Sequence, residues 1–303
     1  MKDFTGVIAV VPTPFDDAGR IDEASLERLI GYYMSLGLQG LTIMGVMGEG
    51  SKLSAAESQH LMRRIFAIAD GGIPLIVGAT NSSDDALVAL TEEAMSLGAA
   101  GPMISPKPGL PAGDAAVQDY FAQICHRLGP NVPICVQDYP PASGVRISAQ
   151  GLADMFRDLP QLGMVKLEDN PNLAKLTEVL RLFKAGPQPR PSLFVGNNAL
   201  YTELELARGA DGIMTGFAFP EMLQEMYRLQ QAGDAEAVAR LFQIYMPLIR
   251  YESQPGLGLA ARKYVLMRQG LLTTAKLREP GYDLTPEDQA EIDLMLDRLK
   301  RQL

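Results

Sequence analysis

Ser35-Leu36-Gly37-Leu38-Gln39-Gly40, followed by the apolar run at residues 41–44, is the first occurrence of a pattern that recurs along the chain. Ser96-Leu97-Gly98-Ala99-Ala100-Gly101 precedes residues 102–104 in the same way, and Ala207-Arg208-Gly209-Ala210-Asp211-Gly212 precedes residues 213–215. Each copy has the form of a helix end with a glycine cap, then a short turn, then a buried strand. The repetition predicts a chain built from helix–turn–strand units.

Eight apolar segments of strand length alternate with segments of helical periodicity. The strands are expected at residues 7–11, 41–44, 74–77, 102–104, 133–136, 164–167, 193–195 and 213–215. Helical periodicity is found at residues 24–33, 57–68, 84–95, 114–128 and 152–159. Apolar strands that alternate with helices indicate a parallel sheet covered by helices. Eight units in about 250 residues favour a closed α/β barrel of the (β/α)8 or TIM type over an open sheet.

The C-terminal segment, residues 234–303, is expected to be a helical extension. Residues 235–250 and 259–267 have an amphipathic pattern, and Thr285-Pro286-Glu287-Asp288 is typical of a helix start. No low-complexity linker separates this segment from residues 1–233. We therefore expect a barrel over residues 1–233 with the helical segment packed on it.

Composition limits the classes of partner. The chain has 303 residues, 47% of them hydrophobic, and no apolar stretch approaches the ~20 residues that span a bilayer. Residues 1–6 lead straight into a strand without a secretion signal, which predicts a cytoplasmic protein, and Cys125 and Cys135 are expected to be buried thiols in a reducing compartment. The net charge of -9 argues against nucleic acid and anionic membranes as partners, but it does not exclude an anionic substrate.

Lys166 is the first candidate for chemistry. It lies inside Gly163-Met164-Val165-Lys166-Leu167-Glu168, near the carboxyl end of the sixth expected strand, where barrel enzymes place their catalytic groups. Burying an ammonium costs several kcal/mol unless it is paired or loses its proton, and a neutral lysine amine can form a Schiff base with a ketone. The alternative is a lysine at the strand end that reaches solvent and pairs with Glu168 or Asp169.

Two loops at carboxyl ends of strands are further candidates. The glycine-rich turn at residues 45–50 follows the second strand, and its backbone N–H groups could hold a small anion. It lacks the order of a phosphate loop or a dinucleotide loop, so an ordinary turn is the alternative. Residues 137–144, after the fifth strand, form a polar patch that could equally be an ordinary barrel loop.

Elimination narrows the class of reaction. The only histidines, His60 and His126, fall on expected helices away from the strand ends. No His/Cys cluster for zinc and no histidine base for a serine triad is visible, and no cofactor is expected. A metal-free barrel with a lysine inside a strand indicates Schiff-base chemistry on a 2-oxo acid.

Several motifs together resemble the dihydrodipicolinate synthase/N-acetylneuraminate lyase superfamily. They run in order over nearly the whole chain: Val11-Pro12-Thr13-Pro14-Phe15, residues 45–49, residues 140–144, Lys166 in Val-Lys-Leu-Glu, Gly196-Asn197-Asn198 and residues 212–216. The resemblance implies a TIM barrel, a homotetramer or homodimer, that binds pyruvate or a 2-oxo sugar acid as an imine on Lys166. It implies that the following residues contact the substrate: Gly45, Val46, Met47, Gly48, Gln137, Gly196 and Thr215.

The chain departs from the family pattern at functional positions. The family's Gly-Thr-Thr-Gly-Glu is replaced by Gly45-Val46-Met47-Gly48-Glu49, which removes two hydroxyls and leaves the backbone N–H groups around Met47 and Gly48 for the carboxylate. The position of the catalytic tyrosine is Gln137, and Tyr139 follows two residues later. The tyrosine pair of the synthases falls at Lys107-Pro108, and their substrate-binding arginine falls at Ala142. These losses make lysine-pathway synthesis a poor fit.

Residues 136–144 and 247–252 look more similar to the 2-keto-3-deoxyarabonate dehydratase branch. That resemblance implies dehydration or aldol cleavage of a 2-keto-3-deoxy sugar acid. In the leading mechanism Lys166 forms the imine, the turn at residues 45–50 holds the carboxylate, and Glu49, Asp138 or Tyr139 moves protons. The alternatives are a 4-hydroxy-tetrahydrodipicolinate (dihydrodipicolinate) synthase and a non-catalytic protein that binds or senses a 2-oxo acid.

Overall fold

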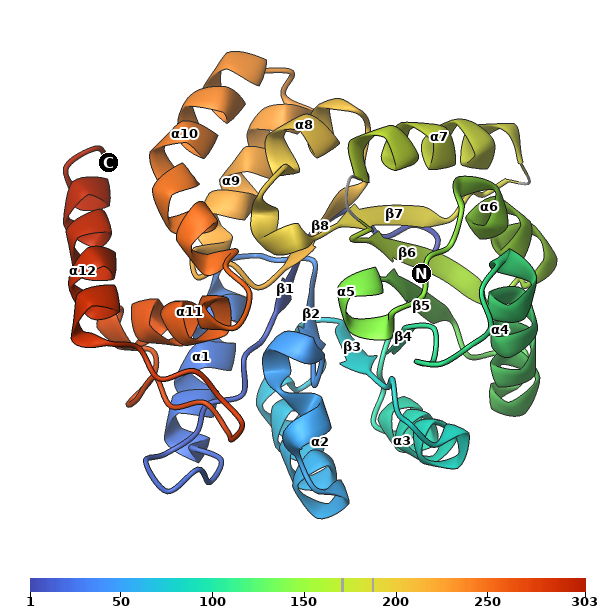
Figure 1. The fold of residues 1–303 in the computed structure, drawn as a ribbon, viewed down its shortest axis with the longest axis horizontal. Coiled ribbons are helices and arrows are strands. Elements are labelled where there is room, and N and C mark those ends of the chain that lie inside the picture. The colour runs from blue at the N-terminus through green and yellow to red at the C-terminus, as the bar shows by residue number, and fades with distance from the viewer. Residues whose placement is uncertain (170–171, 187) are drawn as a thin grey trace.

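The computed structural model describes residues 1–169, 172–186 and 188–303, and its centre is a closed barrel of parallel strands (Figure 1). The strands are paired in chain order, and β8 closes the barrel on β1. Each lies within two residues of its expected bounds, which confirms the TIM-barrel prediction. Their bounds are β1 (Gly6–Val10), β2 (Gly40–Ile43), β3 (Leu75–Gly78), β4 (Gly101–Ile104), β5 (Ile134–Asp138), β6 (Leu162–Leu167), β7 (Ser192–Val195) and β8 (Gly212–Thr215).

Helices surround the barrel as an outer ring (Figure 1). They are α1 (Glu23–Ser35), α2 (Ala55–Ala69), α3 (Asp84–Ser96), α4 (Asp114–Leu128), α6 (Ala149–Asp158), α7 (Asn172–Ala185), α8 (Thr202–Ala207) and α9 (Pro220–Gln231). The short α5 (Pro140–Ser143) follows β5, and the short 3-10 turns η1 (Val46–Gly48), η2 (Gly50–Lys52) and η3 (Asn197–Ala199) follow β2 and β7. The carboxyl ends of the strands are therefore covered by short turns and the amino ends of helices.

Alternation along each strand separates two layers of side chains. Met164 belongs to a cluster in the barrel interior with Phe194 and Cys135, whereas Val165 and Leu167 belong to the layer between strands and helices. Because residues i and i+2 of a strand share a face, Lys166 points into the barrel with Met164. The expected orientation of Lys166 is confirmed.

The C-terminal segment forms α10 (Ala235–Glu252), α11 (Leu257–Arg268) and α12 (Pro286–Lys300), which lie together on one side of the barrel (Figure 1). Val238 and Ile292 from this segment belong to the same hydrophobic cluster as Leu29 of α1. Thr285 and Asp288 form a reciprocal capping box at the start of α12. The extension and the barrel therefore share one core, and the boundary at residue 233 stays a prediction.

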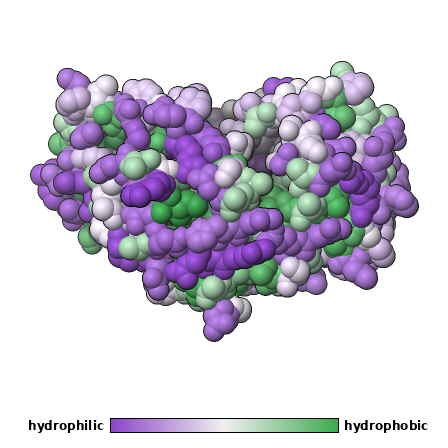
Figure 2. Space-filling view, turned by 90° about the horizontal axis from the view of Figure 1, so that it is seen from below, coloured by the Kyte–Doolittle hydropathy of each residue, from purple (hydrophilic) through white to green (hydrophobic). Residues whose placement is uncertain are grey.

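The side of the molecule covered by α1, α2 and α3 is mainly hydrophilic, with small hydrophobic patches separated by polar side chains (Figure 2). Its outline is notched at the upper edge of the view. In the part of the chain that the structure describes, no helix has the length and apolar character needed to cross a membrane.

Candidate active site

A cluster of polar side chains lies at the mouth of the barrel around Lys166. The Lys166 Nζ is 3.1 Å from the Glu168 Oε2, and the two side chains are only 6% and 9% exposed. Gln137 of β5 is paired in register with Lys166 of β6, and its Nε2 donates to the same Glu168 oxygen at 2.9 Å. An amine, a carboxylate and an amide therefore meet in an almost completely buried site.

The Glu168 carboxylate is held on its other side by the connection after β7. The backbone N–H of Asn197 donates to Glu168 Oε1 at 3.2 Å. A Cβ added at Gly196 would lie 2.3 Å from the same oxygen, so glycine at this position makes room for the carboxylate. Gly196 was expected to contact substrate, and the structure places it against Glu168.

The Ser105 hydroxyl fixes the orientation of the Gln137 amide, and the Thr80 hydroxyl in turn holds the Ser105 backbone. Ser105 Oγ donates to Gln137 Oε1 at 3.2 Å, and the Ser105 backbone N–H donates to Thr80 Oγ1 at 2.9 Å. Because a carboxylate only accepts hydrogen bonds, the Gln137 NH₂ group faces Glu168 and the carbonyl oxygen faces Ser105. Gln137, expected to contact substrate, thus also holds Glu168 in place.

Tyr139 lies just beyond the end of β5 and is partly buried. Burial raises the pKa of its phenol, and the negative charge of Glu168 raises it further. The phenol is therefore protonated at neutral pH, so it has a proton to donate in this region, although the raised pKa makes it a weaker acid.

Asp138 lies on the other side of β5 from Gln137. It is fully buried, and Lys175 of α7 binds its Oδ2 at 2.5 Å and the Asp169 Oδ2 at 3.0 Å. Burial raises the pKa of Asp138 to about 6, although Lys175 opposes the shift. Alternation along the strand separates Asp138 from the cluster around Lys166, so the geometry does not support its expected role in moving protons.

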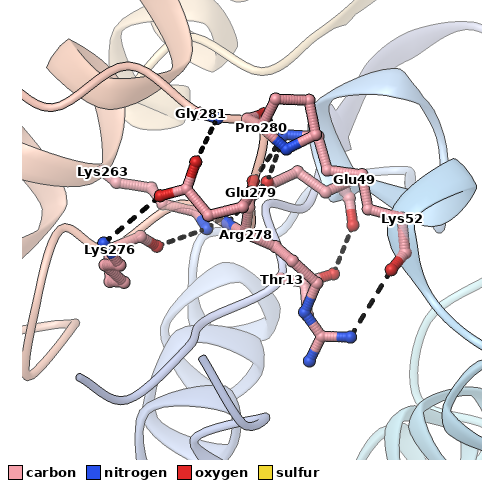
Figure 3. Close-up of polar contacts among 10 residues, drawn as sticks. Thr13, Glu49, Lys52, Lys263, Lys276, Arg278, Glu279, Pro280 and Gly281 are labelled. Atoms are coloured by element: carbon pink, nitrogen blue, oxygen red, sulfur yellow. Dashed lines mark hydrogen bonds and ion pairs between the residues drawn. The ribbon is translucent and has the colours of Figure 1, made fainter. Parts of the chain in front are cut away.

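Glu49 faces the C-terminal segment (Figure 3). Its buried carboxylate accepts from Lys263 Nζ at 2.6 Å, from Lys52 Nζ at 3.0 Å and from the Arg278 backbone N–H at 3.0 Å. A carboxylate with three such donors is held in one orientation. The expected role of Glu49 in proton transfer gains no support from this arrangement, which is that of an anchor.

The glycine-rich turn after β2 carries backbone donors. Gly48 donates its N–H to the Gly45 oxygen at 3.0 Å, and the Gly48 oxygen accepts from Thr13 Oγ1 at 2.6 Å. Within the described residues, the N–H groups of Val46 and Met47 have no hydrogen-bond partner. The free donors of the turn are therefore at Val46 and Met47, and the amide of Gly48 is used internally.

Met47 and Thr215 complete the set of expected site residues. The Met47 side chain packs against the cluster in the barrel interior. Thr215 is buried at the end of β8 and is paired with Ala9, whose side chain belongs to the layer between strands and helices. The register thus places Thr215 on the helix-facing side, away from the inward-facing cluster.

Sequence reasoning did not assign a role in the site to Glu168, Ser105 or Thr80. The spacing Lys166-Leu167-Glu168 was the available signal, because residues two apart share one face of a strand. Ser105 and Thr80 each follow the end of a strand, where polar side chains face the mouth of a barrel.

Other reactive groups lie elsewhere. Cys125 and Cys135 are buried free thiols, as expected, and burial raises their pKa values to about 11 and 12. His60 pairs with Glu23 on the protein surface, and His126 is exposed on α4. The described residues contain no group of three or more His, Cys, Asp or Glu side chains placed to hold a metal ion. That the protein needs no metal stays a prediction.

The chain was compared with known families and proteins. Residues 3–299 match the model of the dihydrodipicolinate synthetase family. The L-2-keto-3-deoxyarabonate dehydratase of Azospirillum brasilense is 30% identical over 297 residues, which cover 97% of this chain and 94% of that protein. A 4-hydroxy-tetrahydrodipicolinate synthase of Persephonella marina is 28% identical over 299 residues, which cover 97% of both chains. The crystal structure of a dihydrodipicolinate synthase from Rhodopseudomonas palustris has a TM-score of 0.95, with 38% identity and 98% of both chains covered.

Proposed function

Since this chain belongs to the dihydrodipicolinate synthetase family, whose members are lyases, we propose that it is a lyase that binds a 2-oxo acid as a Schiff base on Lys166. The observation that carries the proposal is the pair of Lys166 and Glu168 at the mouth of the barrel, with 3.1 Å between Nζ and Oε2. A buried amine needs a nearby base to lose its proton before it attacks a ketone, and Glu168 is within hydrogen-bond reach.

The Schiff base supplies an electron sink. The neutral Lys166 amine adds to the C2 carbonyl of the substrate. The proton that Glu168 took from the ammonium returns to the hydroxyl of this adduct, which leaves as water to give an iminium ion and a Glu168 carboxylate. The positive iminium stabilises the electron pair that remains when a proton is removed from C3. We propose that Glu168 removes this proton, because its carboxylate is held next to Lys166 by Gln137 and by the Asn197 backbone.

The substrate carboxylate is proposed to bind at the turn after β2. The free N–H groups of Val46 and Met47 provide donors there without the hydroxyls that the family pattern usually contains. The protonated phenol of Tyr139 and the carboxylic acid formed on Glu168 are the proposed proton donors to a leaving hydroxyl at C4.

A 2-keto-3-deoxy sugar acid is the proposed substrate class, with dehydration as the proposed reaction and aldol cleavage as its variant. The Azospirillum relative is an L-2-keto-3-deoxyarabonate dehydratase. Two features of the site agree with this class: Gln137 stands where the synthases have a tyrosine, and Ala142 stands where they have a carboxylate-binding arginine.

The test of the imine is borohydride reduction in the presence of pyruvate, followed by mass spectrometry. One adduct located on Lys166 is expected, and none in Lys166→Ala. An adduct that persists in Lys166→Ala, or no adduct in the unchanged protein, would contradict the proposal.

Synthesis of 4-hydroxy-tetrahydrodipicolinate is the second candidate, favoured by the similarity to the Persephonella enzyme. Condensation of pyruvate with aspartate semialdehyde is expected to be at least roughly a hundredfold slower than turnover of the best 2-keto-3-deoxy sugar acid. The lost tyrosine and arginine remove a general acid–base worth ~10²-fold or more and a charge-assisted hydrogen bond of about 1.5 to 3 kcal/mol. Rescue of a diaminopimelate auxotroph at normal expression would favour the synthase, and imine trapping without turnover of any substrate would favour a sensor.

We also propose that the protein acts in the cytoplasm as a homodimer or homotetramer. The buried free thiols fit a reducing compartment. Three large hydrophobic residues are about half exposed in the single chain: Val46 at 54%, Leu204 at 48% and Leu294 at 47%. Such residues are available for contact with a second subunit. Sedimentation of a single monomeric species at micromolar concentration would contradict the oligomer.

A further inference from the structure

Residues 276–281 of the C-terminal extension, called the strap here, lie beside Glu49 and Lys52 in the connection that carries the glycine-rich turn (Figure 3). Lys52, which follows the glycine-rich turn, donates through its Nζ to the strap carbonyl oxygens of Arg278 at 2.8 Å and Pro280 at 2.7 Å. Lys263 of α11 donates to the carbonyl oxygen of Lys276 at 3.0 Å. The strap is thus tied to the connection between β2 and α2 by lysine side chains.

Glu49 is the junction of these contacts. Its side chain is 1% exposed, and it binds both Lys263 and Lys52 as well as the strap amide of Arg278. A carboxylate buried to this extent is tolerated only with donors around it, because an uncompensated buried charge costs several kcal/mol. Removing one lysine therefore disturbs the position of Glu49.

The backbone of Glu49 continues the glycine-rich turn. Its φ and ψ of 54° and 30° are left-handed, and its N–H donates to the Val46 oxygen at 3.1 Å. A residue other than glycine keeps this strained conformation only where its surroundings fix it. The ion pairs of the Glu49 side chain supply that constraint, while Thr13 holds the Gly48 oxygen from the other side.

Lys263 is the most deeply placed of the donors to Glu49. Its side chain is 0% exposed, and its Nζ lies 4.5 Å from the centre of the Phe15 ring. Burial lowers the pKa of Lys263 to about 8, and Glu49 limits the fall. The proposed mechanism uses no group of α11, so catalysis by itself does not account for this buried cation.

We infer that Lys263 is a positioning residue for the substrate carboxylate: by holding Glu49 it fixes the backbone N–H groups of Val46 and Met47 toward the site. Lys52, which follows the turn, binds the other oxygen of the Glu49 carboxylate. The inference rests on the proposed imine on Lys166. It adds that the C-terminal extension controls the affinity for 2-oxo acids through Lys263.

The test compares two ketones that differ in the carboxylate. Borohydride trapping on Lys166 is titrated with pyruvate and with hydroxyacetone in Lys263→Met, in the unchanged protein and in a matched control, Lys276→Met. Lys276 lies in the strap, but among the described residues its side chain is paired only with the exposed Glu279 and Asp283, at 3.7 Å each. For Lys263→Met, half-saturation with pyruvate is expected to rise at least ~10-fold, since a hydrogen bond to a charged group is worth about 1.5 to 3 kcal/mol. Half-saturation with hydroxyacetone is expected to stay within ~2-fold, because hydroxyacetone has no carboxylate and so does not use the hydrogen bonds of the turn.

Each other outcome overturns the inference. Unchanged pyruvate titration in Lys263→Met shows that the turn does not depend on this lysine, and equal loss for both ketones shows general damage to the site. If Lys263→Met does not fold by circular dichroism, Lys52→Gln is used, because the Lys52 side chain is 25% exposed and leaves no core cavity. Lys52→Gln must then raise half-saturation with pyruvate and leave half-saturation with hydroxyacetone unchanged. Absence of trapping in the unchanged protein overturns the proposed function together with the inference, whereas trapping there with unaltered variants overturns the inference alone.

Discussion

At the scale of single residues, the site is defined by which carboxylate faces Lys166. Glu49 and Glu168 follow strands, Asp138 is the last residue of β5, and all three are buried. Only Glu168 is bonded to Lys166, whereas Asp138 is bonded to Lys175 and Glu49 to Lys263. The partner of each carboxylate therefore favours Glu168 as the candidate base, and Asp138 and Glu49 as structural anchors.

Glu168→Gln is predicted to lower turnover of the best 2-keto-3-deoxy sugar acid at least ~10²-fold, because the amide cannot accept a proton. Pyruvate trapping on Lys166 should persist, since glutamine has nearly the same shape. Initial rates and borohydride trapping measure the two effects. Glu178→Gln is the control, because Glu178 is 47% exposed on α7 and pairs only with Arg181 among the described residues. Turnover of Glu168→Gln within ~10-fold of the unchanged protein would remove Glu168 from the mechanism.

The thiols are predicted to be inert in the folded protein. Burial raises the pKa values of Cys125 and Cys135 to about 11 and 12, so neither forms the reactive thiolate at pH 8. Iodoacetamide at pH 8 should modify neither in buffer and both in concentrated urea, as counted by mass spectrometry. Rapid modification of Cys135 without denaturant would show that the barrel interior opens to solvent.

At the scale of elements, the close approach of β3 to the turn after β2 limits what can stand at Gly78. A Cβ added there would lie 2.7 Å from the Met44 oxygen and 2.8 Å from the Gly45 nitrogen, both backbone atoms. Gly78→Ala is predicted to destabilise the protein by about 1–3 kcal/mol and to weaken pyruvate trapping, because the turn must shift. Urea unfolding and trapping titrations measure the two changes.

Gly31→Ala is the matched control for Gly78→Ala. Gly31 lies within α1, is exposed, and a Cβ there meets nothing within 4 Å. Alanine is favoured over glycine in a helix by roughly 0.5–1 kcal/mol, so this variant should be slightly more stable with unchanged trapping. A Gly78→Ala protein that unfolds like Gly31→Ala would show that the turn tolerates displacement.

At the scale of the whole molecule, activity is predicted to survive chelation. The sequence offers two histidines, both on helices, and no cluster of metal ligands. Prolonged dialysis against EDTA should leave turnover of the 2-keto-3-deoxy sugar acid within ~2-fold of the untreated protein, because Schiff-base chemistry uses the iminium in place of a metal. Loss of turnover that a divalent ion restores would place the enzyme in another mechanistic class.

The whole molecule also links its C-terminal extension to the mouth of the barrel. Glu49 and Lys263 are 214 residues apart in the chain and 2.6 Å apart in space. The extension therefore does more than cover hydrophobic surface, since its strap is hydrogen-bonded to the connection that carries the proposed carboxylate site.

The sequence by itself determined the barrel, its eight strands, the helices of the extension and the inward orientation of Lys166. These follow from local patterns, namely apolar runs, glycine caps and the alternation of side chains along a strand. Gln137 was singled out by the resemblance to the family's tyrosine position, because the expected strand ended at residue 136 and the structure extends β5 to Asp138.

Only the tertiary structure decided which charged groups meet. Asp138 is matched to Lys175 of α7, which follows 37 residues later in the chain, and Glu49 is matched to Lys263 by the return of the C-terminal helices to the barrel. The pairing of Lys166 with Glu168 was one of the alternatives that the sequence offered, and the structure adds that Gln137 of the neighbouring strand and Asn197 after β7 hold this carboxylate against Gly196. The role of a charged side chain depends on the groups that it contacts. When those groups come from distant segments, strand register and helix packing decide the contact, and a local sequence pattern does not contain that information.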